Sequence, residues 1–173
     1  MPQTILALFG IVLASILALH QSRTSIQTER QTEAAEVQAL AAEVAMTRMA
    51  ELEALPFDQA VADGIYMESP TELTPIVGGG FTPPGLDPPG DDLDDANGTV
   101  VEAVYALRDG ASGGIRLRTA VVVRYVQESD GETVTSTRTR LKRATVTVQP
   151  ATATTVRPVR LTQLFSCGSY CTW

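Results

Sequence analysis

Residues that could carry catalytic chemistry are scarce in this sequence. His20 is the only histidine, so catalysis that depends on a histidine base has almost nothing to work with. The sequence contains no phosphate-loop or H-E-x-x-H pattern that would indicate a nucleotide-binding or zinc-protease site. An enzyme is therefore the least favoured class of function, and no cofactor is expected.

Carboxylates are concentrated in residues 87–97, where hard oxygen ligands on a loop would suit Ca²⁺. The spacing does not match an EF-hand, because Leu93 stands where the first Asp should be. A solvated acidic turn without a metal ion is the favoured interpretation, and calcium remains the alternative. The acidic and amide residues are Asp87, Asp91, Asp92, Asp94, Asp95 and Asn97.

Two covalent modifications are suggested by local sequence. Asn97-Gly98-Thr99 is an N-glycosylation sequon, so Asn97 could carry a glycan if the host has the enzyme. Cys167 and Cys171 enclose three residues, and a disulfide is favoured in an oxidising compartment. A metal site is disfavoured because no His or further Cys could complete it, and the spacing of a redox pair would be C-x-x-C.

Composition excludes one class of partner and favours a compartment. The net charge of −7 argues against nucleic-acid binding, which needs a basic face to neutralise phosphates. Few lysines, many threonines and the paired cysteines are typical of an extracytoplasmic, β-rich domain.

The first 55 residues predict one long helix with two different halves. Residues 1–22 contain no Asp, Glu, Lys or Arg, and as a helix they would be about 33 Å long, enough to span a bilayer core of about 30 Å. A cleaved signal peptide is less well supported, because no basic residue precedes the apolar run. We expect this half to be buried in a membrane or a filament core through Ile5, Leu6, Leu8, Phe9, Gly10, Ile11, Leu13, Ala14, Ile16 and Leu17.

Residues 23–55 form the amphipathic half, with apolar residues at three- and four-residue spacings. This stripe should pack on a folded head through Val37, Leu40, Val44, Leu52 and Leu55. A simple anchor followed by a coiled stalk is the plainer alternative. The stripe is too rich in alanine and too irregular in heptad phase for a committed coiled coil.

The rest of the chain predicts a loop region and a β-sheet head. Pro56 should end the helix, and frequent Pro and Gly in residues 56–98 predict loops. Segments 99–108, 115–128 and 133–148 are typical of strands, a fourth is expected near 156–165, and Asp130-Gly131 predicts a hairpin turn. Arg138, Arg140 and Lys142 share the phase of Val146, a conflict that a bulge or an early strand end would resolve. The predicted fold class is α+β: a long N-terminal helix packed on a small antiparallel sheet (residues 99–173).

Three stretches together resemble the type IV pilin superfamily, which includes minor pilins and type II secretion pseudopilins. They are the apolar N-terminus that continues into an amphipathic helix, the helix end at Leu55-Pro56-Phe57-Asp58, and the alternating segment from Leu141 to Val148. The sequence departs from the family at Ile5, where pilins usually carry Glu, and no basic leader precedes Met1. The numbered chain is then either the processed form or a divergent branch.

The resemblance implies a structural subunit of an extracellular, pilus-like filament at the cell surface. Its partners would be identical subunits, the inner membrane before assembly, and the pilus assembly machinery. Two alternatives remain open: a minor pilin or pseudopilin of an assembly or secretion machine, and a non-polymerising single-span envelope protein whose β-head binds a ligand. Gly10 fits both close helix packing and a tolerated small residue in a span.

Overall fold

The computed structural model describes residues 2–76, 81, 92–107, 114–152 and 156–173. For residues 2–12 and 14, it describes the backbone alone. The chain divides into two compact units, Met1–Val37 and Gln38–Trp173. This division lies inside the first helix, so the helix contributes its last turns to the second unit, which we call the head.

Helix α1 (Pro2–Glu53) is the long N-terminal helix that the sequence predicts. Its 52 residues correspond to about 78 Å at 1.5 Å per residue. Pro2 lies in the first turn, where a missing N–H is tolerated. Beyond Glu53 the chain turns toward Pro56, and the N–H groups of Ala54 and Leu55 donate to the carbonyls of Glu51 and Leu52, each at 3.2 Å.

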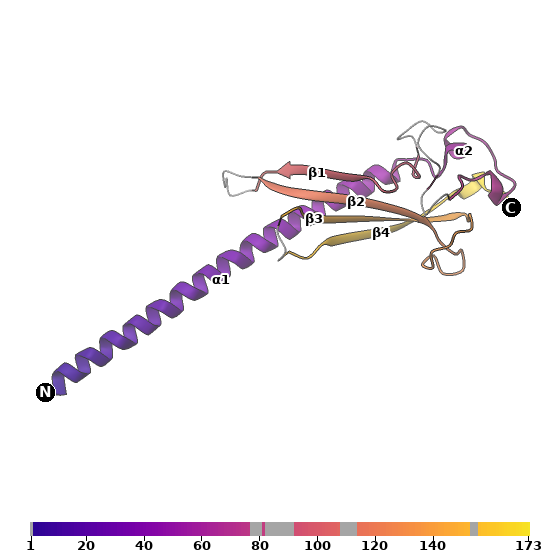
Figure 1. Cartoon of the computed structure of the whole chain (residues 1–173). Helices are drawn as coiled ribbons and strands as arrows, with labels where there is room; N and C mark the ends of the chain where they lie inside the picture. The colour runs from indigo at the N-terminus through magenta and orange to yellow at the C-terminus, as the bar shows by residue number, and fades with distance from the viewer. Residues whose placement is uncertain (1, 77–80, 82–91, 108–113, 153–155) are drawn as a thin grey trace. The chain divides into compact units, whose positions relative to one another are not determined.

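The head contains a four-stranded antiparallel sheet in the order β1-β2-β3-β4 (Figure 1). Each strand pairs with the next one in the sequence, so the sheet is a meander, as predicted. Its strands are β1 (Val100–Tyr105), β2 (Ile115–Tyr125), β3 (Leu141–Pro150) and β4 (Val159–Ser166). The α+β class is therefore confirmed. Three short helical turns, α2 (Gln59–Ala62), η1 (Pro70–Glu72) and η2 (Gly168–Tyr170), lie outside the sheet.

The predicted start of the third strand was wrong. β3 begins at Leu141 rather than at residue 133, so Arg138 and Arg140 precede the regular strand. The chain instead makes a small excursion, in which Val126 and Val134 form an isolated bridge. Arg138 and Arg140 shared the strand phase of the apolar Val146, and their position outside β3 removes that conflict. Lys142, which has the same phase, stays in the strand.

The turn at residues 129–132 is present, but its chemistry differs from the expected one. Only Gly131 has a positive φ, 66°, so Asp130 does not supply a second left-handed residue. Its carboxylate instead accepts hydrogen bonds from the N–H groups of Glu132 and Thr133, at 2.9 and 3.0 Å. The side chain therefore stabilises the turn by mimicking backbone pairing.

The hydrophobic core lies between the last turns of α1 and one face of the sheet. Ala41, Ala45, Met49 and Leu52 are at most 6% exposed, and their spacing places them on one helix face. They belong to one cluster with alternate residues of β2 and β3, such as Val121 and Val146. A second cluster forms beside it around Phe57, Met67, Leu73 and Tyr125, together with both cysteines.

Candidate functional site

Lys142, the only lysine of the chain, is the centre of a buried ionic cluster in the head. Its side chain is 0% exposed and lies on the same face of β3 as Val146, as the strand phase requires. The ammonium Nζ donates to the Phe57 carbonyl at 2.6 Å and to Asp58 Oδ2 at 3.1 Å. It also lies 2.7 and 2.8 Å from the two carboxylate oxygens of Asp94.

Three segments that are distant in sequence hold these groups together. Asp58 follows the helix break, caps α2, and accepts a hydrogen bond from the Thr74 N–H at 2.9 Å. Asp94 belongs to a turn that is tied to the helix break, because the Leu93 N–H donates to the Pro56 carbonyl at 3.0 Å. Aromatic rings complete the environment of Nζ, which lies 4.2 Å from the centroid of the Phe57 ring and 5.1 Å from that of the Tyr125 ring.

Asp92 is the third carboxylate of the cluster. Its Oδ1 accepts hydrogen bonds from the N–H groups of Asp94 and Asp95, at 2.7 and 3.2 Å, while the buried Oδ2 has no hydrogen-bond partner. The expectation of a solvated acidic turn is thus wrong for Asp92 and Asp94, which are 0% and 5% exposed. The turn faces the core because Leu93, which lies between these acids, and Ala96, which follows them, are also buried. Asp87 and Asp91 lie outside the described residues.

Burial with three carboxylates and one ammonium shifts the protonation of this cluster. Desolvation raises the pKa of Asp94 to about 8 and that of Asp92 to about 6, although the attraction of Lys142 opposes both shifts. Burial also raises the pKa of Tyr125, whose hydroxyl donates to the Thr74 carbonyl at 3.2 Å. Asp94 therefore retains at neutral pH a proton that it would release in the unfolded chain.

Asp58, Asp92 and Asp94 could each offer one carboxylate oxygen to a metal ion, because these three oxygens lie within 4.8 Å of one another. The ammonium of Lys142 already contacts two of these carboxylates, and it would repel a divalent cation beside it. The arrangement thus favours a structural ion-pair cluster. That the chain binds no metal stays a prediction.

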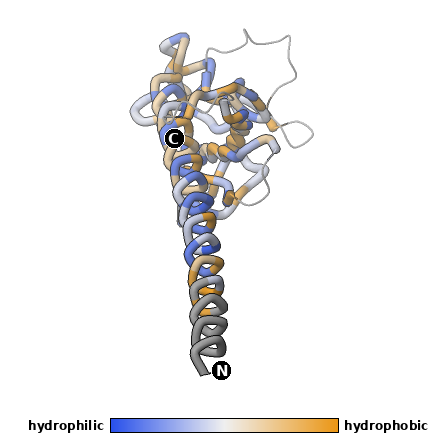
Figure 2. The backbone as a smooth tube through the Cα atoms, turned by 90° about the vertical axis from the view of Figure 1, so that its left-hand side faces the viewer, coloured by the Kyte–Doolittle hydropathy of each residue, from blue (hydrophilic) through white to orange (hydrophobic). Residues whose placement is uncertain are grey.

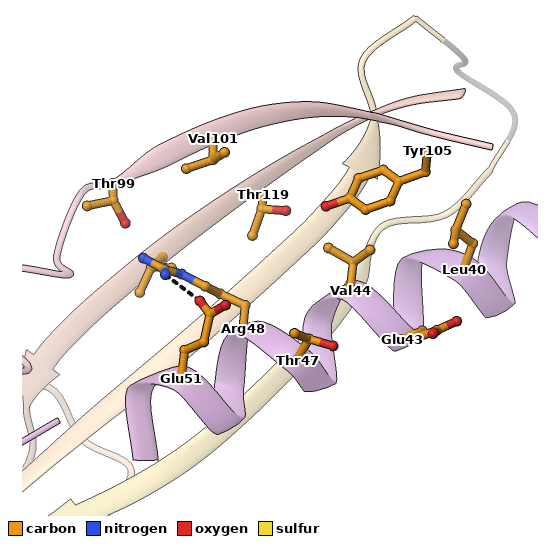
Figure 3. A pocket seen from close by; sticks show the side chains of 11 residues that line it. Leu40, Glu43, Val44, Thr47, Arg48, Glu51, Thr99, Val101, Tyr105 and Thr119 are labelled. Atoms are coloured by element: carbon orange, nitrogen blue, oxygen red, sulfur yellow. Dashed lines mark hydrogen bonds and ion pairs between the residues drawn. The ribbon is translucent and has the colours of Figure 1, made fainter. Parts of the chain in front are cut away.

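A groove lies between α1 and the part of the sheet formed by β1 and β2 (Figure 3). It has a volume of about 400 Å³ and is lined by one stretch of helix and two strands. Leu40, Glu43, Val44, Thr47, Arg48 and Glu51 come from α1, and Thr99, Val101, Tyr105, Thr119 and Val121 come from the opposite wall. Val101 pairs with Thr119 and faces the helix side of the sheet, yet 54% of its surface is exposed.

The N-terminal part of α1 exposes large apolar side chains. Leu13, Ile16, Leu17 and Leu19 are 49–65% exposed, and Figure 2 shows hydrophobic residues here followed by more hydrophilic ones along the helix. Among the described residues, no helix holds a stretch that is long and apolar enough to cross a bilayer. The side chains of Ile5, Leu6, Leu8, Phe9, Gly10, Ile11 and Ala14 lie outside the described residues.

Hydroxyl groups in the next turns of α1 bond to their own helix. Ser22 donates to the Ala18 carbonyl at 3.0 Å, and Thr28 and Thr32 donate to carbonyls four residues earlier, at 2.9 Å each. A hydroxyl satisfied in this way can be covered by a neighbouring chain without leaving a buried donor unpaired.

The stripe that was expected to pack on the head is partly or fully covered. Leu52 is 0% and Val37 is 4% exposed. Leu40, Val44 and Leu55 are partly buried against the core of the head.

The predicted disulfide is confirmed, since Cys167 and Cys171 are bonded with a Cα–Cα distance of 5.9 Å. The loop it closes is anchored by the Met67 N–H, which donates to the Tyr170 carbonyl at 2.8 Å. Tyr66 stacks on Tyr170 with ring centroids 5.2 Å apart.

Asn97 has a structural role that the sequon did not reveal. Its Oδ1 accepts hydrogen bonds from the Val123 N–H at 2.9 Å and from the Arg124 guanidinium at 2.8 Å. The side chain is half-buried and joins the 92–98 turn to β2. Glycosylation at Asn97 stays a prediction.

The fold of the head, rather than any single sequence motif, assembles the ionic cluster. Only some of its residues could be found from the sequence. Lys142 was visible as a cation in phase with Val146, but its partners Asp58 and Asp94 are 84 and 48 residues away. Comparison with known proteins adds no assignment, because no family model, curated protein or solved structure matches the chain.

Proposed function

We propose that this chain is a structural subunit of an extracellular, pilus-like filament that assembles through its apolar N-terminal helix. One observation carries the proposal: four large apolar residues of α1 between Leu13 and Leu19 are about half exposed or more. Exposed apolar surface on a helix is a site of association with protein or membrane. Neighbouring copies of α1 would cover it in a filament.

The head supplies what such a subunit needs at the outer surface. The sheet and the last turns of α1 share one core, so the helix cannot separate from the head without losing that core. The ionic cluster adds a further link between the helix break and β3. A force applied along the helix would thus be transmitted to the folded head.

Membrane anchoring before assembly is part of the proposal and rests on the uncharged sequence of residues 1–22. Lipid would cover the apolar residues until other copies of the chain replace it. The inner membrane and an assembly machinery would then be the transient partners, and identical subunits the permanent ones. A minor pilin or pseudopilin would use the same surface at lower abundance.

The test is mechanical shearing of cells that produce the chain, followed by electron microscopy and mass spectrometry of the released material. Leu17→Asp should abolish filaments, because a carboxylate would be buried among apolar helices. Gln31→Asp, at an exposed polar position of the same helix, is the matched control and should leave filaments unchanged. Recovery of the unaltered chain only with membranes would contradict the filament and favour a single-span envelope protein.

A further inference from the structure

One face of α1 carries alternating apolar and basic residues. Leu19, Arg23, Ile26 and Arg30 recur at spacings of three and four, so their side chains lie in a row on the helix. Leu19 is 65% and Ile26 50% exposed, and both arginines are exposed. We call this row the basic–apolar face.

The groove of the head has the complementary pattern. Leu40 and Val44 form an apolar wall opposite the exposed Val101. Glu43 and Glu51 stand along the rim, both exposed, and Glu51 is already paired with Arg48 at 2.6 Å. Figure 3 shows Leu40, Val44 and Glu51 along one stretch of α1 and pointing toward the strands. The rim therefore carries two carboxylates and one guanidinium.

The two surfaces match in length and charge spacing. The groove wall from Leu40 to Glu51 and the face from Leu19 to Arg30 each cover eleven helical steps, or about 16.5 Å. Arg23 and Arg30 are separated by about 10.5 Å along the axis, and Glu43 and Glu51 by about 12 Å. Flexible arginine side chains can absorb this difference.

We propose that the basic–apolar face of one copy occupies the groove of a second copy, with the two α1 helices parallel. Leu19 and Ile26 would cover the apolar wall and Val101, while Arg23 pairs with Glu43 and Arg30 with Glu51. This contact rests on the proposed filament, and it would set the axial offset between neighbouring subunits. Because the face and the groove are different surfaces, the contact is heterologous and can repeat without closing.

Charge reversal in the full chain tests the contact in producing cells, with sheared polymer as the readout. Glu43→Arg and Arg23→Glu alone should each lower the yield about tenfold or more, since 1.4 kcal/mol is a tenfold change in affinity and like charges in contact cost more. Together, Arg23→Glu and Glu43→Arg should restore it. Rescue of Arg23→Glu by Glu51→Arg instead would show antiparallel packing and overturn the parallel register.

A photo-cross-linker locates the occupant directly. Ile26 replaced by p-benzoylphenylalanine should cross-link to residues 40–51 or 99–121 of another copy. The same replacement at Val134, which is 51% exposed and outside both surfaces, should not. Filaments that cross-link elsewhere would overturn this contact and leave the proposed function standing. Absence of filaments from the unaltered chain would overturn the proposed function itself.

Discussion

Replacing Lys142 with methionine tests the view that the buried ionic cluster holds the helix break onto the sheet. Methionine preserves most of the length of the side chain but removes the ammonium. Asp58 and Asp94 then lose their partner at 2.7–3.1 Å, in surroundings where both are at most 5% exposed. Removal of one partner from a buried ion pair typically costs about 3–5 kcal/mol.

Urea unfolding followed by the fluorescence of Trp173, the only tryptophan, measures this loss in the full chain. Trp173 packs against the second core cluster, so it reports on the head. With a slope of about 2 kcal/mol per molar urea, the unfolding midpoint should fall by about 2 M. Arg143→Met, at the next residue of β3, removes a hydrogen bond on the exposed side and should change stability by about 0.5 kcal/mol or less.

The pH dependence of this variant sharpens the test. Without the ammonium, the carboxylates must be neutralised by protons, so the loss of stability should be smaller at pH 5 than at pH 8. A loss for Lys142→Met below about 1 kcal/mol, or one equal to that of Arg143→Met, would refute the structural role of the cluster. A loss independent of pH would show that the carboxylates stay unprotonated.

Further predictions concern the unaltered head and three of its side chains. The raised pKa of Asp94, about 8, means that the folded state binds a proton more tightly than the unfolded state. The unfolding free energy should therefore fall by a few kcal/mol from pH 5 to pH 8. A urea midpoint that does not change with pH would contradict this. Amine acetylation of the native chain should modify the α-amino group but not Lys142, which should react only after unfolding; native labelling at Lys142 would show that it is accessible. Asn97→Ala should lower the unfolding free energy by about 1–3 kcal/mol because the Val123 N–H loses its acceptor. A loss of stability seen only when the unaltered chain carries a glycan would argue against this structural role of Asn97. Cys167→Ser should destabilise the C-terminal loop yet leave filaments able to form; loss of filaments with a folded head would place the loop at a subunit contact.

Local sequence determined the large elements of this fold, and tertiary pairing determined the site. The absence of Gly and Pro between residues 11 and 55 predicted α1 correctly, and alternation predicted β3 from Leu141 onward. Asp130-Gly131 predicted the position of the turn, although the dipeptide did not reveal that the Asp130 carboxylate accepts two backbone hydrogen bonds. The strand at 133–140 was wrong because Thr and Val there have strand propensity without a partner strand that would pair with them regularly.

The buried acids could not be predicted because burial of charge depends on a partner distant in sequence. Asp92 and Asp94 lie in a stretch whose composition is typical of a solvated loop. The neighbouring Leu93 and Ala96 gave a local indication that the turn faces inward. Only the fold shows that Lys142 and the helix break lie beside it.

The central claim is that exposed apolar residues of α1 are covered by other copies of the chain in a filament. Cryo-electron microscopy of material sheared from producing cells, with the subunit identified by mass spectrometry, tests this most directly. The account predicts a helical polymer of this chain with α1 in its core and the β-sheet heads outside. A polymer built from another protein, or this chain found only in the membrane fraction, would contradict it.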